Sequence, residues 1–236
     1  MKRIAVGAAC ALAIGGGAVG AALATADGDS NTQGANVTGV YNITVQNLSA
    51  GQPLSPPLIV KHDRRARVWQ NGTAASHVVA NIAEDANNAP AIQLLNRVRG
   101  VQGASTGVDQ GATAPAPIPP GAGQTYRVRV NNPTDRVSLI SMLVNTNDGF
   151  TGLDSYRLRN GTRVLVRRAY DGGSETNNQL ARSIPGPCCN NPMVRDPEGR
   201  TIRPHPGLRN GVGQLTRAQH GFNRRAVARI TVEKVS

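Results

Sequence analysis

The chain has 236 residues, a length that suits one large all-β domain or two small ones. It carries 26 Lys and Arg against 14 Asp and Glu, a net charge of +12, and only Lys2, Lys61 and Lys234 are lysines. This excess favours an acidic partner such as an anionic polysaccharide or a membrane surface, although dispersed arginines can also simply solvate a surface. Aromatic residues are 3% of the chain, which leaves few stacking platforms, so we do not expect nucleic-acid binding.

The N-terminal residues 1–26 have the pattern of a signal peptide. Lys2 and Arg3 precede a small-residue-rich apolar run at 4–19, and A-x-A cleavage motifs follow, the last ending at Ala26. No later run reaches the roughly 18 apolar residues that a transmembrane helix needs. We therefore expect a chain that is exported, secreted or periplasmic, with a flexible linker at 27–37 and one domain at 38–236.

The hydrophobic pattern after residue 37 is mostly that of β-strands. Tyr41, Ile43 and Val45 alternate with polar residues, and the run 136–144 is apolar enough for a central strand covered on both faces. The predicted elements in chain order are strands at 37–48 and 58–60, helices within 74–86 and 90–101, a Gly/Ala/Pro-rich loop or edge segment at 102–123, and strands at 124–130, 136–144, 156–159, 164–169 and 225–235.

Two further features complete the predicted fold. Asn160-Gly161 between the strands at 156–159 and 164–169 is a strong hairpin signal. The proline-rich segment 176–222 lacks periodicity and is predicted to be mostly loop. Because strand pattern appears at both ends of the domain, the terminal strands should pair, and the class is an all-β sandwich with minor helical insertions.

Two acidic, glycine-bearing turns bracket the predicted hairpin, at 145–149 and 171–175. Asp148 and Asp171 could ligate a hard cation, because glycines beside them let backbone carbonyls turn inward. Equally, Asp-Gly is ordinary turn chemistry, and the residues alone leave both interpretations open. Asp154 could be an additional metal ligand or could cap the short turn that follows it.

The cysteines and histidines provide no familiar catalytic motif. Cys188 and Cys189 are adjacent and could form a vicinal disulfide or simply pack in a proline-rich loop. Neither a His-Glu-x-x-His nor a Gly-x-Ser-x-Gly motif is present. His62-Asp63 could be a base with an orienting acid, but no nucleophile is indicated.

Several stretches spread over the domain together carry a family resemblance. They are YNITV (41–45), PP (56–57), AS (75–76), IAED (82–85), PIPPG (117–121), SLISML (138–143), TNDGFTGLD (146–154) and DGGSE (171–175). They resemble the spondin N-terminal domain in its short bacterial form over about residues 38–235. The last two stretches are the most specific.

The resemblance implies a C2-like antiparallel β-sandwich, an extracellular location and one bound Ca2+ ion. Carried over residue by residue, the family's metal ligands fall on Asp148, Asp171 and Glu175. The family's Pro-Asp-Trp turn is Asn147-Asp148-Gly149 here, and Glu175 stands in place of an Asp, which keeps the charge and lengthens the side chain. Animal relatives act in adhesion and matrix binding, but their thrombospondin repeats are absent, so no partner can be carried over.

These observations together predict a secreted, calcium-binding β-sandwich that serves as an extracellular binding or adhesion module without catalysis. Its partner would be an extracellular or cell-surface ligand, anionic if the arginines take part. The alternative is a secreted hydrolase or lyase that uses the metal and arginines on an anionic polymer. A third interpretation is a purely structural matrix or envelope component.

Overall fold

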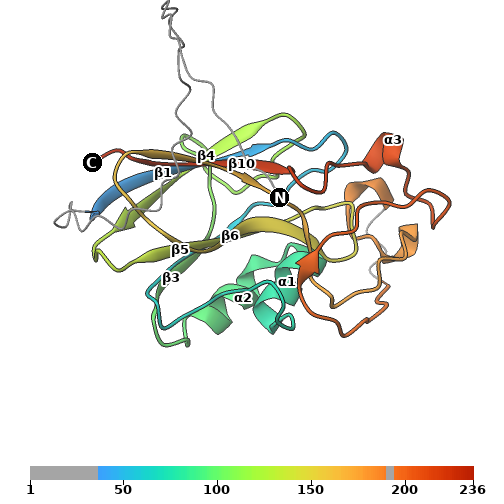
Figure 1. The fold of residues 1–236 in the computed structure, drawn as a ribbon, viewed down its shortest axis with the longest axis horizontal. Coiled ribbons are helices and arrows are strands. Elements are labelled where there is room, and N and C mark those ends of the chain that lie inside the picture. Colours follow the sequence, from blue (N-terminus) through green and yellow to red (C-terminus); the bar gives the residue numbers. More distant parts are fainter. Residues whose placement is uncertain (1–36, 190–193) are drawn as a thin grey trace, which may run out of the picture. The chain divides into compact units, whose positions relative to one another are not determined.

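The computed structural model describes residues 37–189 and 194–236, so the predicted signal peptide and nearly all of the predicted linker lie outside the described residues. Within those ranges the strands form two antiparallel sheets (Figure 1), ordered β4-β1-β10-β7 and β3-β2-β5-β6-β8-β9. The elements are β1 (Gly39–Asn47), β2 (Leu58–His62), α1 (His77–Asp85), α2 (Asn88–Leu95), β3 (Val101–Thr106), β4 (Gly123–Val130), β5 (Arg136–Met142), β6 (Gly149–Arg157), β7 (Thr162–Arg167), β8 (Tyr170–Asp171), η1 (Ala181–Ser183), η2 (Pro187–Cys189), β9 (Arg203–Pro204), α3 (Arg217–His220) and β10 (Ala228–Lys234).

The inner faces of the two sheets form the main core. Alternation along β1 places Tyr41, Ile43 and Val45 inward, all with 0% exposure. Ile230 and Val232 of β10 lie in the same cluster, because β1 and β10 pair antiparallel. The predicted all-β sandwich, with its two terminal strands paired, is confirmed.

A second core lies between the six-stranded sheet and the helices. β5 is the covered central strand that the sequence predicted: Leu139 packs in the main core, and Ile140 packs in the second core with Ile82 of α1. α1 begins after an N-cap, Ser76, whose hydroxyl accepts a hydrogen bond from Val79 N at 3.4 Å. Both helical insertions are confirmed, with α2 starting two residues before the proline at 90 that was expected near its start.

The predicted hairpin at Asn160-Gly161 is wrong. β6 pairs with β5 and β8 in one sheet, whereas β7 pairs with β10 in the other. Gly161 does adopt the turn conformation that the motif favours, with φ 73°. The turn therefore carries the chain from one sheet to the other, because β10 offers β7 a partner whose apolar face continues the main core.

The long segment after β8 is mostly irregular, as predicted, but it is anchored. Ile184, Leu208 and Leu215 form a small apolar cluster of their own. β9 pairs with β8, which places this segment at the end of the six-stranded sheet.

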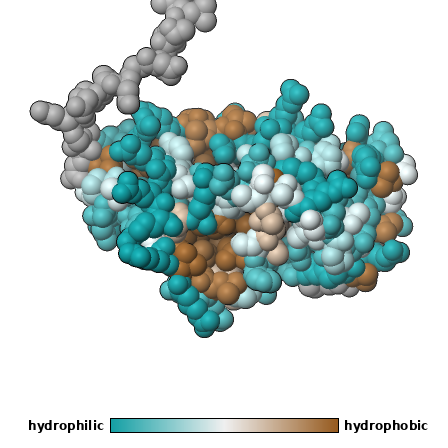
Figure 2. Space-filling view, turned by 60° about the horizontal axis from the view of Figure 1, so that its bottom comes forward, coloured by the Kyte–Doolittle hydropathy of each residue, from teal (hydrophilic) through white to brown (hydrophobic). Residues whose placement is uncertain are grey.

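The surface is mainly hydrophilic on the face that Figure 2 turns forward, where a hydrophobic area also shows between hydrophilic side chains. Large apolar side chains with substantial exposure include Leu94 and Val98 near α2, and Val164 and Val166 on β7. In the described ranges, no helix combines the length and the apolar character that a membrane crossing demands.

Candidate metal centre at the end of the six-stranded sheet

A tight turn after β5 positions the first predicted ligand. Leu143 N donates to Gly149 O at 2.8 Å, and the Thr146 hydroxyl donates to Leu143 O at 2.6 Å and accepts from Gly149 N at 2.9 Å. A side chain at Gly149 would meet the Thr146 hydroxyl at 2.5 Å, so the closed turn requires glycine there. This geometry fixes Asp148 at the entrance to β6.

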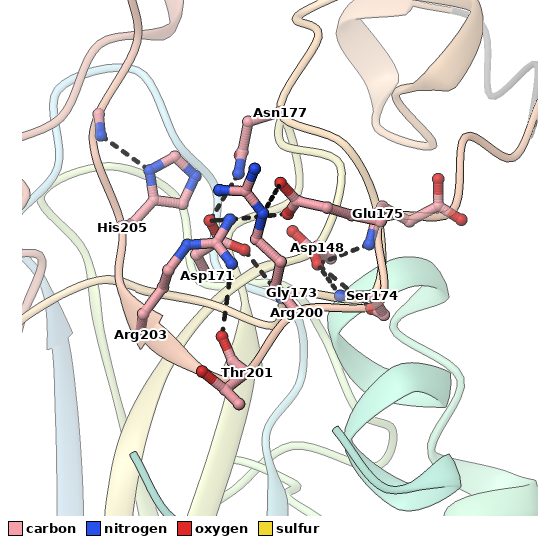
Figure 3. Close-up of polar contacts among 12 residues, drawn as sticks. Asp148, Asp171, Gly173, Ser174, Glu175, Asn177, Arg200, Thr201, Arg203 and His205 are labelled. Carbon is pink, nitrogen blue, oxygen red and sulfur yellow. Dashed lines mark hydrogen bonds and ion pairs between the residues drawn. The ribbon is translucent and has the colours of Figure 1, made fainter. Parts of the chain in front are cut away.

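β8 brings the second predicted ligand to the same place. Asp171 is the register partner of Gly149, and Gly172 N donates to the Asp148 backbone oxygen at 3.0 Å. Figure 3 shows the Asp148 and Asp171 side chains together, with Arg203 from β9 beside Asp171. The structure thus joins two acids that are far apart in the sequence, as predicted.

Within the described part of the chain, only one of the two Asp148 carboxylate oxygens is hydrogen-bonded. Oδ2 accepts from Ser174 N at 2.8 Å, the Ser174 hydroxyl at 3.2 Å and Glu175 N at 2.9 Å. Oδ1 is buried and has no hydrogen-bond partner among the described residues. Burial, and then the charge of Asp171, raise the pKa of Asp148 to about 7. A buried carboxylate with an unpartnered oxygen is stabilised by binding a cation or a proton.

Asp171 is buried but better satisfied. Its Oδ1 accepts from Gly173 N at 2.8 Å, and its Oδ2 accepts from Asn177 Nδ2 at 2.6 Å and from an Nη of Arg203 at 2.8 Å. Burial raises the pKa of Asp171, while the Gly173 hydrogen bond and the Arg203 charge oppose that rise. Gly173 reaches this position with φ +72°, a conformation that suits glycine.

The carboxylate of the third predicted ligand, Glu175, has other partners. Its Oε2 accepts from Asp196 N at 2.6 Å, and its Oε1 lies 3.8 Å from Arg195 Nε. Burial raises the pKa of Glu175. Over residues 37–189 and 194–236, no three or more His, Cys, Asp or Glu side chains converge as a ready metal cluster. The site in this conformation is therefore an acidic pair, with Glu175 contributing its backbone N–H to Asp148.

The remaining predicted site residues lie in other contacts. Asp154 sits within β6 and forms a two-point ion pair with Arg67, at 2.8 and 3.1 Å. Its carboxylate thus acts neither on the acidic pair nor as a turn cap. Cys188 and Cys189 form the vicinal disulfide, with an S–S distance of 2.25 Å, at η2.

Sequence reasoning missed the residues that surround the acidic pair from the irregular segment. Arg203 binds Asp171 and also Glu198, at 2.7 Å. His205 is buried, and its Nδ1 accepts from Gly207 N at 2.9 Å, which requires a neutral ring at that nitrogen. Burial, with Arg203, lowers the pKa of His205 to about 3. No local pattern marks these residues, because only the β8–β9 pairing brings them to the acids.

The comparison with protein families identifies the class. The Spondin_N family model matches residues 50–169, about half of the chain, and the chain belongs to this family. Spondin_N is an extracellular domain family. The match runs from the turn before β2 to the residue before β8, so it includes Asp148 and ends before Asp171 and Glu175. No curated protein matches the chain.

Proposed function

We propose that this chain is an extracellular binding or adhesion module that holds calcium at the Asp148–Asp171 pair and carries out no catalysis. The observation behind the proposal is the burial of two neighbouring carboxylates, one of which keeps an oxygen without a partner in the described structure. A hard cation with a preference for oxygen ligands suits such a pair.

The charges around the pair also fit a cation. Arg203 supplies one positive charge and shares it between Asp171 and Glu198, so the pair keeps excess negative charge. Asp148 Oδ1 and the remaining lone pair of Asp171 Oδ1 would hold the ion, with backbone carbonyls and water completing six to eight oxygens. Glu175 would join them only by exchanging its contacts with Asp196 and Arg195. The burial of both aspartates favours a stabilising ion over a catalytic one, since a catalytic metal keeps an open position for its substrate.

Thermal unfolding in calcium and in chelator tests the proposal. Calcium at about 100 times its Kd should stabilise the protein by ~2.7 kcal/mol, which is several degrees for a domain of this size. Asp171→Asn should abolish the rise. The control Asp154→Asn, which breaks only the exposed ion pair with Arg67, should preserve it. A melting temperature of the wild type that neither calcium nor magnesium changes would refute the metal site.

A further inference from the structure

Three arginines line one pocket at the edge of the four-stranded sheet. The pocket has a volume of about 440 Å³ and is lined by Val166, Arg167, Arg168, Tyr170 and Arg225. The end of β7, the strand β8 and the segment before β10 contribute these side chains, so residues far apart in the sequence meet there. No Asp or Glu belongs to this lining.

Among the described residues, the guanidinium groups of this pocket have no acidic partners. Arg167 Nε donates to the Gly152 backbone oxygen at 2.9 Å, which fixes the side chain at the pocket wall. Arg168 Nε is buried without a hydrogen-bond partner among the described residues. Arg225 donates to the Asn223 side-chain oxygen through its backbone N–H, at 3.1 Å, and not through its guanidinium. Five arginines elsewhere in the described structure form ion pairs with carboxylates, and the arginines of this pocket are not among them: Arg65, Arg67, Arg195, Arg200 and Arg203 are the five.

Three like charges around one pocket repel each other, and a bound anion would remove that cost. The planar guanidinium also matches the two oxygens of a carboxylate or sulfate group. We propose that this pocket, the arginine pocket, binds the acidic groups of an anionic polysaccharide. The proposal rests on the proposed extracellular binding role, but it uses neither Asp148 nor Asp171.

A second pocket is lined in part by Arg224, the chain neighbour of Arg225, and two neighbouring basic pockets match a polymer better than a small free anion. Its volume is about 520 Å³, and its lining includes Arg217, Phe222 and Arg224. Residues of the two pockets are joined through Ala169. Its N–H donates to Arg224 O at 3.0 Å, and its carbonyl oxygen accepts from His205 N at 3.1 Å. Successive sugar units of an extended chain could therefore occupy both.

The aromatic side chains at the two pockets argue against nucleic-acid bases as the ligand. The ring of Tyr170 is already stacked on Phe150, with centroids 5.6 Å apart, and contacts Trp69 edge-on at 4.9 Å. Phe222 is partly exposed and is held edge-on against His205 at 5.1 Å. The described linings of the two pockets thus hold two aromatic rings, each already packed against another ring, whereas single-stranded nucleic acid uses a series of exposed rings.

Titration calorimetry with defined probes tests the arginine pocket. The purified chain is titrated at physiological salt with a heparin hexasaccharide, with a polygalacturonate hexamer, with duplex DNA and with phosphatidylglycerol vesicles. The first two probes separate sulfate from carboxylate recognition. Arg168→Gln/Arg225→Gln is compared with Arg127→Gln/Arg163→Gln, which removes the same charge from exposed positions of β4 and β7.

We expect an oligosaccharide to bind the wild type, the pocket variant to lose about tenfold or more in affinity, and the control to change by less than about twofold. The single variant Arg225→Gln, at an exposed position, should show a smaller loss in the same direction with an unchanged melting temperature. Equal losses in the pocket and control variants would overturn the proposal, as would binding of DNA or vesicles without binding of either oligosaccharide.

Discussion

At the scale of one residue, Asp148 shows how the burial of a carboxylate that suits the proposed metal site lowers the stability of the fold without metal. Its carboxylate is fully buried beside Asp171, which is unfavourable for two negative charges without a cation. Three donors hold Oδ2 in place, while Oδ1 remains without a partner in the described structure. The orientation that would suit the proposed calcium ion thus destabilises the metal-free fold.

Asp148→Asn should therefore stabilise the metal-free protein and abolish the calcium response. The asparagine oxygen can keep the contacts of Oδ2, and its NH2 group would replace the unpartnered Oδ1 beside Asp171. The folded pKa of Asp148 is about 7, above the value of 3.8 expected when unfolded, so the native state binds the extra proton. The destabilising effect of Asp148 is complete above pH 7 and fades as the pH falls toward 4.

Melting curves in chelator between pH 4 and 8 measure this effect. At pH 8 the variant should exceed the wild type by on the order of 2 kcal/mol, and the difference should shrink in acid. A variant that is less stable than the wild type at pH 8, by an amount independent of pH, would contradict the charge argument.

At the scale of elements, the pairing of β5 with β6 depends on a glycine. A Cβ at Gly152 would lie 1.8 Å from the Leu139 backbone oxygen, where the register shifts between Val137 and Leu139. Gly152 also offers its carbonyl to Arg167, so this point connects the sheet to the arginine pocket. The close approach explains why β6 needs glycine in a strand that is otherwise well packed.

Gly152→Ala should destabilise the domain strongly, by about 3 kcal/mol or more, since the backbone of β5 must move. Gly103→Ala is the matched control: it lies in β3 of the same sheet, and an added Cβ meets nothing within 4 Å. Urea unfolding should show a loss for the first variant and little change for the second. Equal urea midpoints for the two variants would mean that β5 and β6 can move apart to accommodate the added Cβ without loss of stability.

At the scale of the whole molecule, the first and last strands of the domain pair at the centre of the four-stranded sheet. β10 lies between β1 and β7, and its buried side chains Ala228, Ile230 and Val232 fill the main core. Burying a Val or Ile side chain stabilises a fold by about 1.5–3 kcal/mol, so β10 accounts for a large part of a marginal total stability.

Ending the chain after Val227 should therefore abolish cooperative unfolding, because β1 and β7 lose their shared partner. Removing only residues 235–236 should lower the melting temperature by a few degrees, since β1 residues 41–47 keep their pairing with β10. Circular dichroism melts distinguish the two outcomes. A cooperative transition in the shorter chain would show that the sheet closes without β10.

The sequence by itself determined the β-sandwich, its central strand, its terminal pairing and the two acidic turns. These follow from local period and turn chemistry, which act over a few residues. Only the tertiary structure decided that Asn160-Gly161 connects two sheets, because β10, far along the chain, competes successfully for β7. It also decided that the Glu175 carboxylate accepts from Asp196 N, that Arg203 lies beside Asp171, and that the three arginines of the arginine pocket lie around one hollow. Such long-range pairings depend on which buried faces fit together, and no local pattern encodes that choice.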